Sequence, residues 1–528
     1  MTAAFHLSRP TNLREKLAQL MFVRVGSNLP PIRTVEEDAQ RFRQMLASCP
    51  VGGLLLFNGR REATPDTLAS LQSASSQPLL VAADIERGVG QQLLGHAQFP
   101  HAMGFESLGG DADQAVHRFA HLTAAIARAN GIHITLAPVA DVNVDPRNPI
   151  IATRAFGSDP DRVASLVSAF VKGTRSGGLL STAKHFPGHG NTHEDSHHTL
   201  PTVSASREEM ESCELTPFRA AIAIDVPLVM TAHVRYPHLD KSGKCATLSH
   251  PILTELLREQ LGFRGAVVSD SLLMDGVKSQ TASEGELAVE ALLAGVDILL
   301  DVADPVSALA AMEQAVCSGD LPEQRVEEAF ERLWRLKEAV FVGHSPMLAD
   351  STIGTEDELS EVLRQADEHA LSVATRSITC LSGDKSLLPF AKEKSFCTVL
   401  VRPHTSQVEP VEQPLGASLR HQFPECAYYE ITPNSDSGAI AHVVQAASTA
   451  EQLLIALIVK PSAWRRFGLL DDQSALVKQL TQGRKCVLAS LGTPESLQEF
   501  GDATLSLCTY SDVPNSQVAL ARYLVMPR

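Results

Sequence analysis

Eight short apolar runs recur along the first 345 residues, and each ends at a polar residue and is followed by an amphipathic stretch. The runs cover residues 19–25, 51–58, 78–84, 132–141, 178–185, 227–233, 265–270 and 296–301. Near-continuous apolar runs of this kind are typical of parallel strands that are covered by helices on both sides. Eight such units in roughly 330 residues predict a (β/α)8 TIM-type barrel, with a doubly wound sheet as the alternative.

A second, smaller domain is predicted beyond the barrel. Residues 325–342 form a long amphipathic pattern that closes the first domain, and a connector with Gly, Pro and Ser follows. Five further apolar runs then alternate with helical stretches: 377–383, 396–403, 452–460, 485–492 and 503–510. We therefore expect a barrel domain over 1–345, a linker over 346–360, and a three-layer α/β/α domain over 361–528.

Composition and charge narrow the class of protein. Hydrophobic residues make up 44% of the chain and charged residues 20%, which excludes disordered, collagen-like and coiled-coil proteins. The net charge, 45 basic minus 61 acidic residues, is −16, which argues against nucleic acid or an anionic membrane as a partner. The nine cysteines contain no C-x-x-C pair, so we expect no disulfide framework. Neither a signal sequence nor a membrane-spanning run is visible, so we expect a cytoplasmic protein.

Polar side chains with catalytic potential stand where the apolar runs stop. These residues are Asn58, Asp84, Asp141, Lys184, His185, His233, Asp270 and Asp301. In a barrel the carboxyl ends of all strands meet at one mouth, where active sites are built. Any single one of them is as well explained as a helix cap or a turn residue. Their recurrence at successive ends predicts an active site.

The densest chemistry lies in residues 184–201, KHFPGHGNTHEDSHHTLP, with five histidines, two carboxylates and one lysine. The glycines and proline of this segment exclude a helix and permit tight turns. Asp195 and His197 are two residues apart, so in an extended stretch their side chains leave on the same side. A carboxylate beside an imidazole fixes its tautomer and favours its charged form. This pair predicts a general acid, although loop histidines are often merely solvated.

A metal site is the rival interpretation of the same histidines. His185, His189, His193 and His197 are four residues apart, which on a helix would make a metal-binding stripe. Phe186-Pro187-Gly188 breaks the helix that this stripe requires. A barrel metallohydrolase with ligands from separate strand ends stays open as an alternative.

A second segment, GFRGAVVSDSLLMDG at 262–276, places Asp270 at the end of the strand AVVS. A carboxylate there would point into the barrel mouth, across from the histidine-rich loop. One carboxylate that acts as nucleophile, together with a separate proton donor, is the plan of a retaining glycosidase.

Both segments resemble signatures of glycoside hydrolase family 3, specifically its β-N-acetylglucosaminidase branch. Residues 184–201 resemble the branch's KHFPGHG-x-T-x-x-DSH-x-x-x-P pattern, and VVSDSLLMDG is similar to the family's SDDL-x-M segment. The stretches VGGLLLFN, APVADVN, NPIIATRAFGSDP and VMTAHVRYP support the likeness in the same order. It covers about residues 12–300 and extends into the second domain.

The resemblance implies an exo-acting, retaining β-N-acetylglucosaminidase that removes terminal N-acetyl-β-glucosaminides from cell-wall muropeptides or chitooligosaccharides. Asp270 would be the nucleophile, and His197 paired with Asp195 would be the acid/base. Four residues would bind the sugar: Asp84, Arg154, Lys184 and His185. The resemblance implies no cofactor and no metal.

Three positions depart from the family pattern. In DIERGVGQQ, Arg87 stands where the family has Gly, and Gln92 stands where it has Arg. Ser271 replaces the second Asp of the SDD segment. Three alternatives stay open: a β-glucosidase, an N-acetylglucosaminide phosphorylase, and a sugar-binding homologue without activity. The phosphorylase is included because a neutral imidazole does not repel phosphate.

Overall fold

The computed structural model describes residues 7–192, 200–342, 345–349, 353–406, 412–461, 467–501 and 504–527. The chain forms two compact units. The barrel unit comprises residues 1–97, 113–148 and 155–366, and the second unit comprises 98–112, 149–154 and 367–528. No helix among these described residues is both long and apolar enough to span a membrane.

Eight parallel strands form the centre of the barrel unit, and each overlaps one of the predicted apolar runs. They are β1 (Met21–Val25), β2 (Gly53–Leu56), β4 (Leu80–Ala83), β6 (Ile134–Thr135), β7 (Leu180–Phe186), β8 (Leu228–Thr231), β9 (Ala266–Val268) and β10 (Leu299–Leu300). Their order is β10-β1-β2-β4-β6-β7-β8-β9. A parallel bridge between Val268 and Ile298 joins the two ends of this row, so the sheet is nearly a closed barrel. The predicted TIM-type barrel is therefore confirmed.

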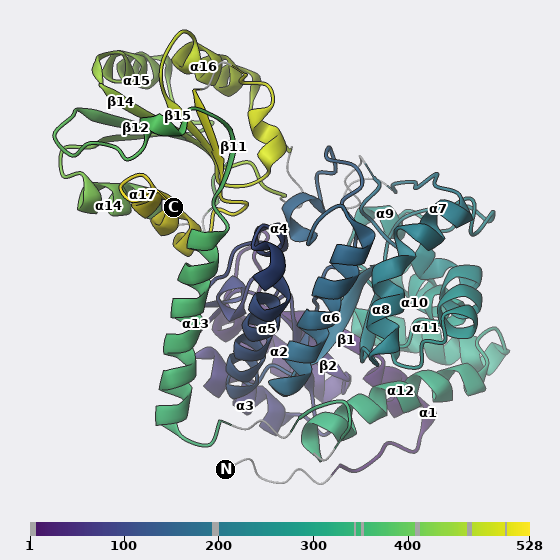
Figure 1. Cartoon of the computed structure of the whole chain (residues 1–528). Helices are drawn as coiled ribbons and strands as arrows, with labels where there is room; N and C mark the ends of the chain where they lie inside the picture. Colours follow the sequence, from purple (N-terminus) through teal and green to yellow (C-terminus); the bar gives the residue numbers. More distant parts are fainter. Residues whose placement is uncertain are drawn as a thin grey trace. The chain divides into compact units, whose positions relative to one another are not determined.

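Helices surround the strands, as the amphipathic stretches between the apolar runs predict (Figure 1). The ring is made by α1 (Leu13–Gln19), α2 (Val35–Ser48), α3 (Thr64–Ala74), α5 (Ala112–Ala129), α6 (Pro160–Ser176), α8 (Leu215–Ala223), η5 (Pro251–Gln260), α10 (Glu284–Ala294), α11 (Pro305–Ser318) and α12 (Glu323–Phe341). Side-chain caps start several of them: Thr34 forms a capping box with Glu37, and Asp159 accepts the N–H of Arg162.

Short elements fill the loops between strands and helices. They are β3 (Gly59–Arg60), β5 (Leu93–Leu94), η1 (Val89–Gln91), α4 (Ala102–Glu106), η2 (Gly109–Asp111), η3 (Ala152–Arg154), α7 (Arg207–Ser212), η4 (Ala246–Leu248) and α9 (Asp275–Lys278). β3 and β5 pair in parallel as a small separate sheet. The next long helix, α13 (Glu356–Arg376), begins inside the predicted linker.

The second unit is built on a six-stranded sheet in the order β11-β16-β15-β14-β12-β13. The strands are β11 (Thr379–Gly383), β12 (Phe396–Val401), β13 (Ala427–Ile431), β14 (Gln452–Leu457), β15 (Val487–Ser490) and β16 (Leu505–Cys508). β11 is antiparallel to β16, whereas the other pairs are parallel. Five of these strands coincide with predicted runs, and the edge strand β13 was not predicted.

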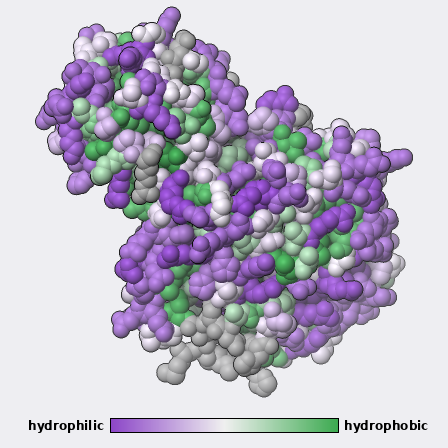
Figure 2. Space-filling model, in the orientation of Figure 1, coloured by the Kyte–Doolittle hydropathy of each residue, from purple (hydrophilic) through white to green (hydrophobic). Residues whose placement is uncertain are grey.

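Helices cover both faces of this sheet, which confirms the predicted three layers (Figure 1). Along β14 alternate residues serve the two cores: Leu454 and Ala456 pack on one face, and Leu453 and Ile455 on the other. The remaining elements are η6 (Lys385–Leu387), α14 (Pro414–Gln422), α15 (Ser437–Thr449), α16 (Asp471–Thr481), η7 (Pro494–Leu497) and α17 (Pro514–Tyr523). The visible surface of each unit is mostly hydrophilic, with apolar residues in scattered patches (Figure 2).

Candidate active site

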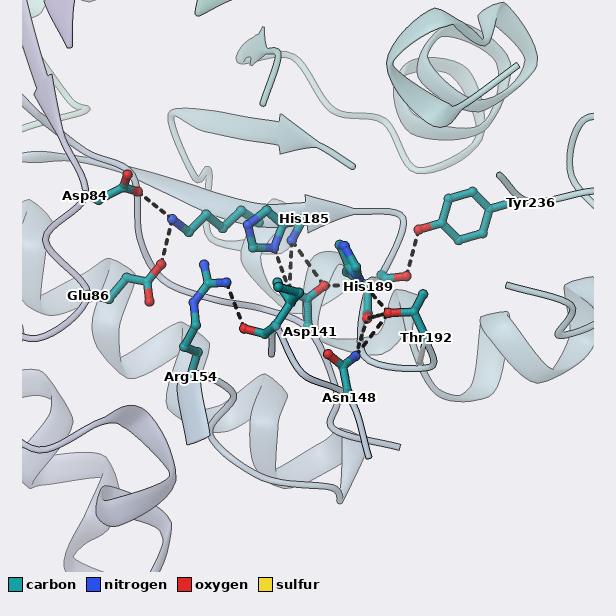
Figure 3. A network of polar contacts seen from close by, with 12 residues as sticks. Asp84, Glu86, Asp141, Asn148, Arg154, His185, His189, Thr192 and Tyr236 are labelled. Atoms are coloured by element: carbon teal, nitrogen blue, oxygen red, sulfur yellow. Dashed lines mark hydrogen bonds and ion pairs between the residues drawn. The ribbon is translucent and has the colours of Figure 1, made fainter. Parts of the chain in front are cut away.

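Lys184 is a buried cation between two carboxylates at the end of β7. Its Nζ lies 2.7 Å from Asp84 Oδ1 and 2.7 Å from Glu86 Oε1. The lysine side chain is only 3% exposed, so the two acids supply the charge compensation that burial demands. The Asp84 side chain keeps 29% exposure, which leaves part of this carboxylate accessible. Two of the predicted sugar-binding residues therefore lie side by side (Figure 3).

Asp141 orients the imidazole of His185. Its Oδ2 lies 2.7 Å from His185 Nδ1, and its Oδ1 accepts the backbone N–H of His189 at 2.7 Å. The Asp141 side chain is completely buried. A carboxylate can only accept a hydrogen bond, so Nδ1 donates to it and the ring is held in one orientation. Figure 3 shows Asp141 beneath both histidines.

The start of the histidine-rich loop is held by hydrogen bonds as far as Thr192. Asn148 Nδ2 donates to the carbonyl of His189 at 2.8 Å, and the hydroxyl of Tyr236 donates to the carbonyl of Gly188 at 2.8 Å. Burial, followed by the charge of His185, lowers the pKa of His189 to about 4. His189 is thus neutral at physiological pH, with Nδ1 2.9 Å from Thr192 Oγ1.

Two glycines of this loop are required by its geometry. Gly188 has φ +134°, a conformation that L side chains rarely adopt. A Cβ at Gly190 would collide with the carbonyl oxygen of Val142. Both positions belong to the KHFPGHG motif, so the glycines of this motif are needed for the backbone conformation of the loop.

Asp270 follows β9 and is held as a carboxylate. Its Oδ1 accepts the backbone N–H of Ser271 at 2.7 Å. Burial raises the pKa of Asp270, but His185, His233, this N–H and Lys184 together outweigh burial and lower it to about 2. Asp270 is therefore ionised at neutral pH, and an ionised carboxylate is the form that can attack an electrophilic carbon.

The residue next to Asp270 belongs to a second hydrogen-bonded chain. Ser271 Oγ donates to Asp301 Oδ2 at 2.6 Å, and Asp301 Oδ1 in turn accepts from Arg24 Nε at 3.0 Å. His233 Nε2 donates to the carbonyl of Ser271 at 3.0 Å. Side chains from the ends of β1, β8 and β10 thus fix the backbone that carries Asp270.

The other predicted residues divide into three groups. Asp195 and His197 lie outside the described residues, so the acid/base pair stays a prediction. Arg154 ends η3, and its guanidinium donates to the carbonyl of Ile150 at 3.0 Å within the second unit. Asn58 takes a left-handed conformation with φ +53° and donates to the carbonyl of Arg33 at 3.1 Å, which is a turn role.

Residues 84–92, which follow β4 and depart from the family pattern, are held by two glutamines of the same segment. Gln91 Oε1 accepts the backbone N–H groups of Glu86 and Arg87, each at 3.0 Å. Gln92 Nε2 donates to the carbonyl of Asp84 at 3.2 Å. Gln92 therefore supports the Asp84 backbone from a buried position. Sequence reasoning missed Glu86 as a partner of Lys184, although its spacing of two from Asp84 was a usable signal.

No group of three or more His, Cys, Asp or Glu side chains that could hold a metal ion occurs within the described ranges. The histidines of the alternative metal stripe at 193 and 197 fall outside these ranges.

Residues 12–336 match the family model described as "Glycosyl hydrolase family 3 N terminal domain". The chain belongs to glycosyl hydrolase family 3. As a family 3 member it is a glycoside hydrolase, and its substrate is a carbohydrate. The resemblance and the enzyme class expected from the sequence are thereby confirmed.

Two relatives by sequence and one solved structure show what this family 3 chain is similar to. Beta-hexosaminidase A of Pseudoalteromonas piscicida is 29% identical over 509 residues, which are 87% of this chain and 82% of the relative. The beta-N-acetylglucosaminidase/beta-glucosidase of Cellulomonas fimi is 29% identical over 402 residues, covering 74% of this chain and 69% of the relative. The solved structure of a family 3 beta-N-acetylglucosaminidase from Paenibacillus sp. str. FPU-7 has a TM-score of 0.83 at 30% identity, covering 98% of this chain and 97% of that one.

Proposed function

We propose that this family 3 enzyme is an exo-acting, retaining β-N-acetylglucosaminidase. Asp270 is the nucleophile, and His197, assisted by Asp195, is the acid/base. The observation that carries the proposal is the ionised carboxylate of Asp270 at the barrel mouth, within the electrostatic influence of Lys184 and His185. The names of the Cellulomonas fimi relative and of the Paenibacillus structure both contain beta-N-acetylglucosaminidase, which supports N-acetylglucosamine as the sugar.

The reaction takes two displacements at the anomeric carbon. In the first, a carboxylate oxygen of Asp270 forms a bond to this carbon while the bond to the leaving oxygen breaks, and protonated His197 gives that oxygen its proton. In the second, water attacks the same carbon and passes a proton to His197, and the bond to Asp270 breaks. Two inversions give net retention, and both residues return to their starting states.

Sugar binding is proposed for Lys184, His185, Asp84 and Arg154. The partly exposed Asp84 carboxylate accepts hydrogen bonds from hydroxyl groups, and Lys184 donates to them while it stays paired. His185 is aimed by Asp141, so its Nε2 meets the sugar in one orientation. The physiological setting that we propose is the recycling of cell-wall fragments in the cytoplasm.

Hydrolysis of an aryl N-acetyl-β-glucosaminide tests the proposal. Asp270→Ala should lose activity by about three orders of magnitude or more, because the nucleophile is gone. Asp275→Ala is the matched control, since this carboxylate is exposed five residues away in the same segment. Absence of turnover by the wild type, or equal activity of the two variants, contradicts the proposal. Nuclear magnetic resonance of the first product anomer tests retention.

His197 is tested by comparing two leaving groups. An activated aryl group departs with little protonation, whereas a sugar leaving group needs the acid. We expect His197→Ala to slow the natural type of substrate much more than the aryl substrate. Equal slowing of both substrates excludes His197 as the acid.

A β-glucosidase activity is the second candidate, because the Cellulomonas fimi relative carries both activities in its name. The ratio of kcat/KM for an aryl N-acetylglucosaminide to that for the matching glucoside decides between the sugars. Adding phosphate to the same assay decides between acceptors, since a phosphorylase releases the sugar 1-phosphate and a hydrolase the free sugar.

A further inference from the structure

A pocket of about 260 Å³ lies at the end of the barrel opposite the candidate active site. Pro227 and Gly265 line it, and they immediately precede β8 and β9. Asp270 and Lys184 lie at the other ends of parallel strands, so the pocket opens at the amino-terminal end of the barrel. Nothing in the proposed glycosidase reaction uses this end.

Three arginines line this pocket: Arg264, Arg332 and Arg335. Arg264 and Arg335 are exposed, and within the described part of the chain their guanidinium groups take part in no hydrogen bond or ion pair. Arg332 uses one nitrogen, Nη1, on Asp297 Oδ1 at 3.0 Å. The pocket therefore offers several N–H groups that have no acceptor among the described residues.

The carboxylate of Asp297, behind the pocket, binds several arginines and therefore cannot neutralise all of their charges. Asp297 is completely buried and pairs with Arg258, Arg325 and Arg332, so one negative charge faces three positive ones. It also accepts the backbone N–H of Val267 at 2.8 Å. Burial, together with the charges of Arg332 and Arg325, lowers the pKa of Arg258 despite its contact with Asp297. Three arginines on one buried carboxylate thus leave positive charge behind the pocket, in a chain whose net charge is −16.

One acid, Asp225, also lines the pocket. It is exposed and forms no ion pair with the pocket arginines or with any other described cation. The pocket lining and the arginines bound to Asp297 together carry more positive than negative charge. The acids are Asp225 and Asp297, and the arginines are Arg258, Arg264, Arg325, Arg332 and Arg335. That excess of positive charge favours an anionic ligand.

The remaining wall is apolar. Ile222, Phe263, Leu336 and Met347 contribute to it, so the ligand needs a small apolar or aromatic part beside its charge. Guanidinium groups present planar pairs of donors that match phosphate oxygens bidentately. We infer that this pocket binds a phosphate monoester with a small aromatic or apolar group, at a site separate from the sugar site.

Isothermal titration calorimetry with phenyl phosphate tests the inference on the full chain, with inorganic phosphate and phenol as part-ligands. We expect saturable binding of phenyl phosphate, weaker binding of inorganic phosphate, and none of phenol. Arg335→Gln and Arg264→Gln should each weaken binding at least tenfold. Arg118→Gln is the matched control, because Arg118 is an exposed helix arginine without an ion pair among the described residues, and it should leave affinity unchanged.

The glycosidase assay separates this site from the active site. All three glutamine variants should keep wild-type turnover, because the substituted side chains are exposed and remote from Asp270. Saturating N-acetylglucosamine should not displace phenyl phosphate. Displacement by the sugar, equal affinity of Arg335→Gln and Arg118→Gln, or no saturable binding by the wild type would each overturn the inference, whatever the enzyme's sugar preference proves to be.

Discussion

Asp141 and His185 form a hydrogen-bonded pair at the mouth of the barrel, with 2.7 Å between Asp141 Oδ2 and His185 Nδ1. The carboxylate has no exposed surface, and its other oxygen accepts the backbone N–H of His189. One buried residue therefore orients the imidazole that is proposed to bind the sugar and also holds the backbone of His189.

Asp141→Asn should lower kcat/KM by about 10- to 100-fold, because a hydrogen bond that involves a charged group contributes about 1.5–3 kcal/mol. The double-mutant cycle with His185→Ala shows whether the effect passes through His185. If it does, Asp141→Asn adds little in the His185→Ala background. Fully multiplicative losses would mean that Asp141 acts elsewhere, and circular dichroism checks that each variant is folded.

Lys184→Met should lower the free energy of unfolding by about 3–5 kcal/mol, because it leaves two carboxylates without their buried cation. The matched control is Lys16→Met, which breaks the more exposed pair with Glu327 and should cost about 1 kcal/mol or less. Denaturant unfolding measures both. Acidification should reduce the loss in Lys184→Met alone, since protonation removes the uncompensated charges on Asp84 and Glu86. Equal losses in the two variants would contradict this account.

Ser271→Asp restores the residue of the family's SDD segment, yet it should lower activity more than Ser271→Ala. Ser271 Oγ donates to Asp301 Oδ2 at 2.6 Å, so a carboxylate there would face another carboxylate. The repulsion would displace the backbone N–H that binds Asp270. We expect a loss of about tenfold for the alanine variant from the missing hydrogen bond, and a larger loss for the aspartate variant that lessens at lower pH. Wild-type kcat/KM for Ser271→Asp would refute the prediction.

The barrel could be predicted because its signal is local. Each strand is a short apolar run that ends in a polar residue, and this pattern depends only on neighbours in the sequence. Strand β13 was not predicted because it lies at a sheet edge, where the half-buried Tyr428 and Glu430 interrupt the apolar run. Edge strands carry less of the apolar signal on which the prediction relied.

The site was only partly predictable for a different reason. Asp84, Lys184, His185 and Asp270 could be singled out from their places at strand ends, and their roles in sugar binding and catalysis stay predictions. The contacts that support them depend on closure of the barrel: Arg24 binds Asp301, which is 277 positions away in the sequence and which accepts a hydrogen bond from Ser271 beside Asp270. Sequence spacing holds no information about such a contact. The role of Asp141 was likewise hidden, although its position at a strand end was noted.

Glu214 supplies a test of pH dependence. Its side chain is buried beneath Gly188, and its Oε2 has no hydrogen-bond partner in the described part of the chain. Burial is the main cause that raises its pKa above the ordinary value of 4.5. As the pH rises from 4.5 toward the raised value, the unfolded chain releases this proton before the folded protein does. Glu214 therefore costs the wild type stability over that interval.

Glu214→Gln removes this titration. The variant should gain stability relative to the wild type as the pH rises above 4.5, by at most about 1.4 kcal/mol per pH unit, until the raised pKa is passed. Thermal unfolding at pH 5, 6, 7 and 8 measures the gain, with these values chosen to span roughly the interval in which a buried glutamate titrates. Glu211→Gln is the control, because this neighbouring carboxylate is exposed and pairs with Arg207. If the two variants differ from the wild type by the same constant amount at every pH, Glu214 is ionised in the folded protein and its burial does not govern its charge.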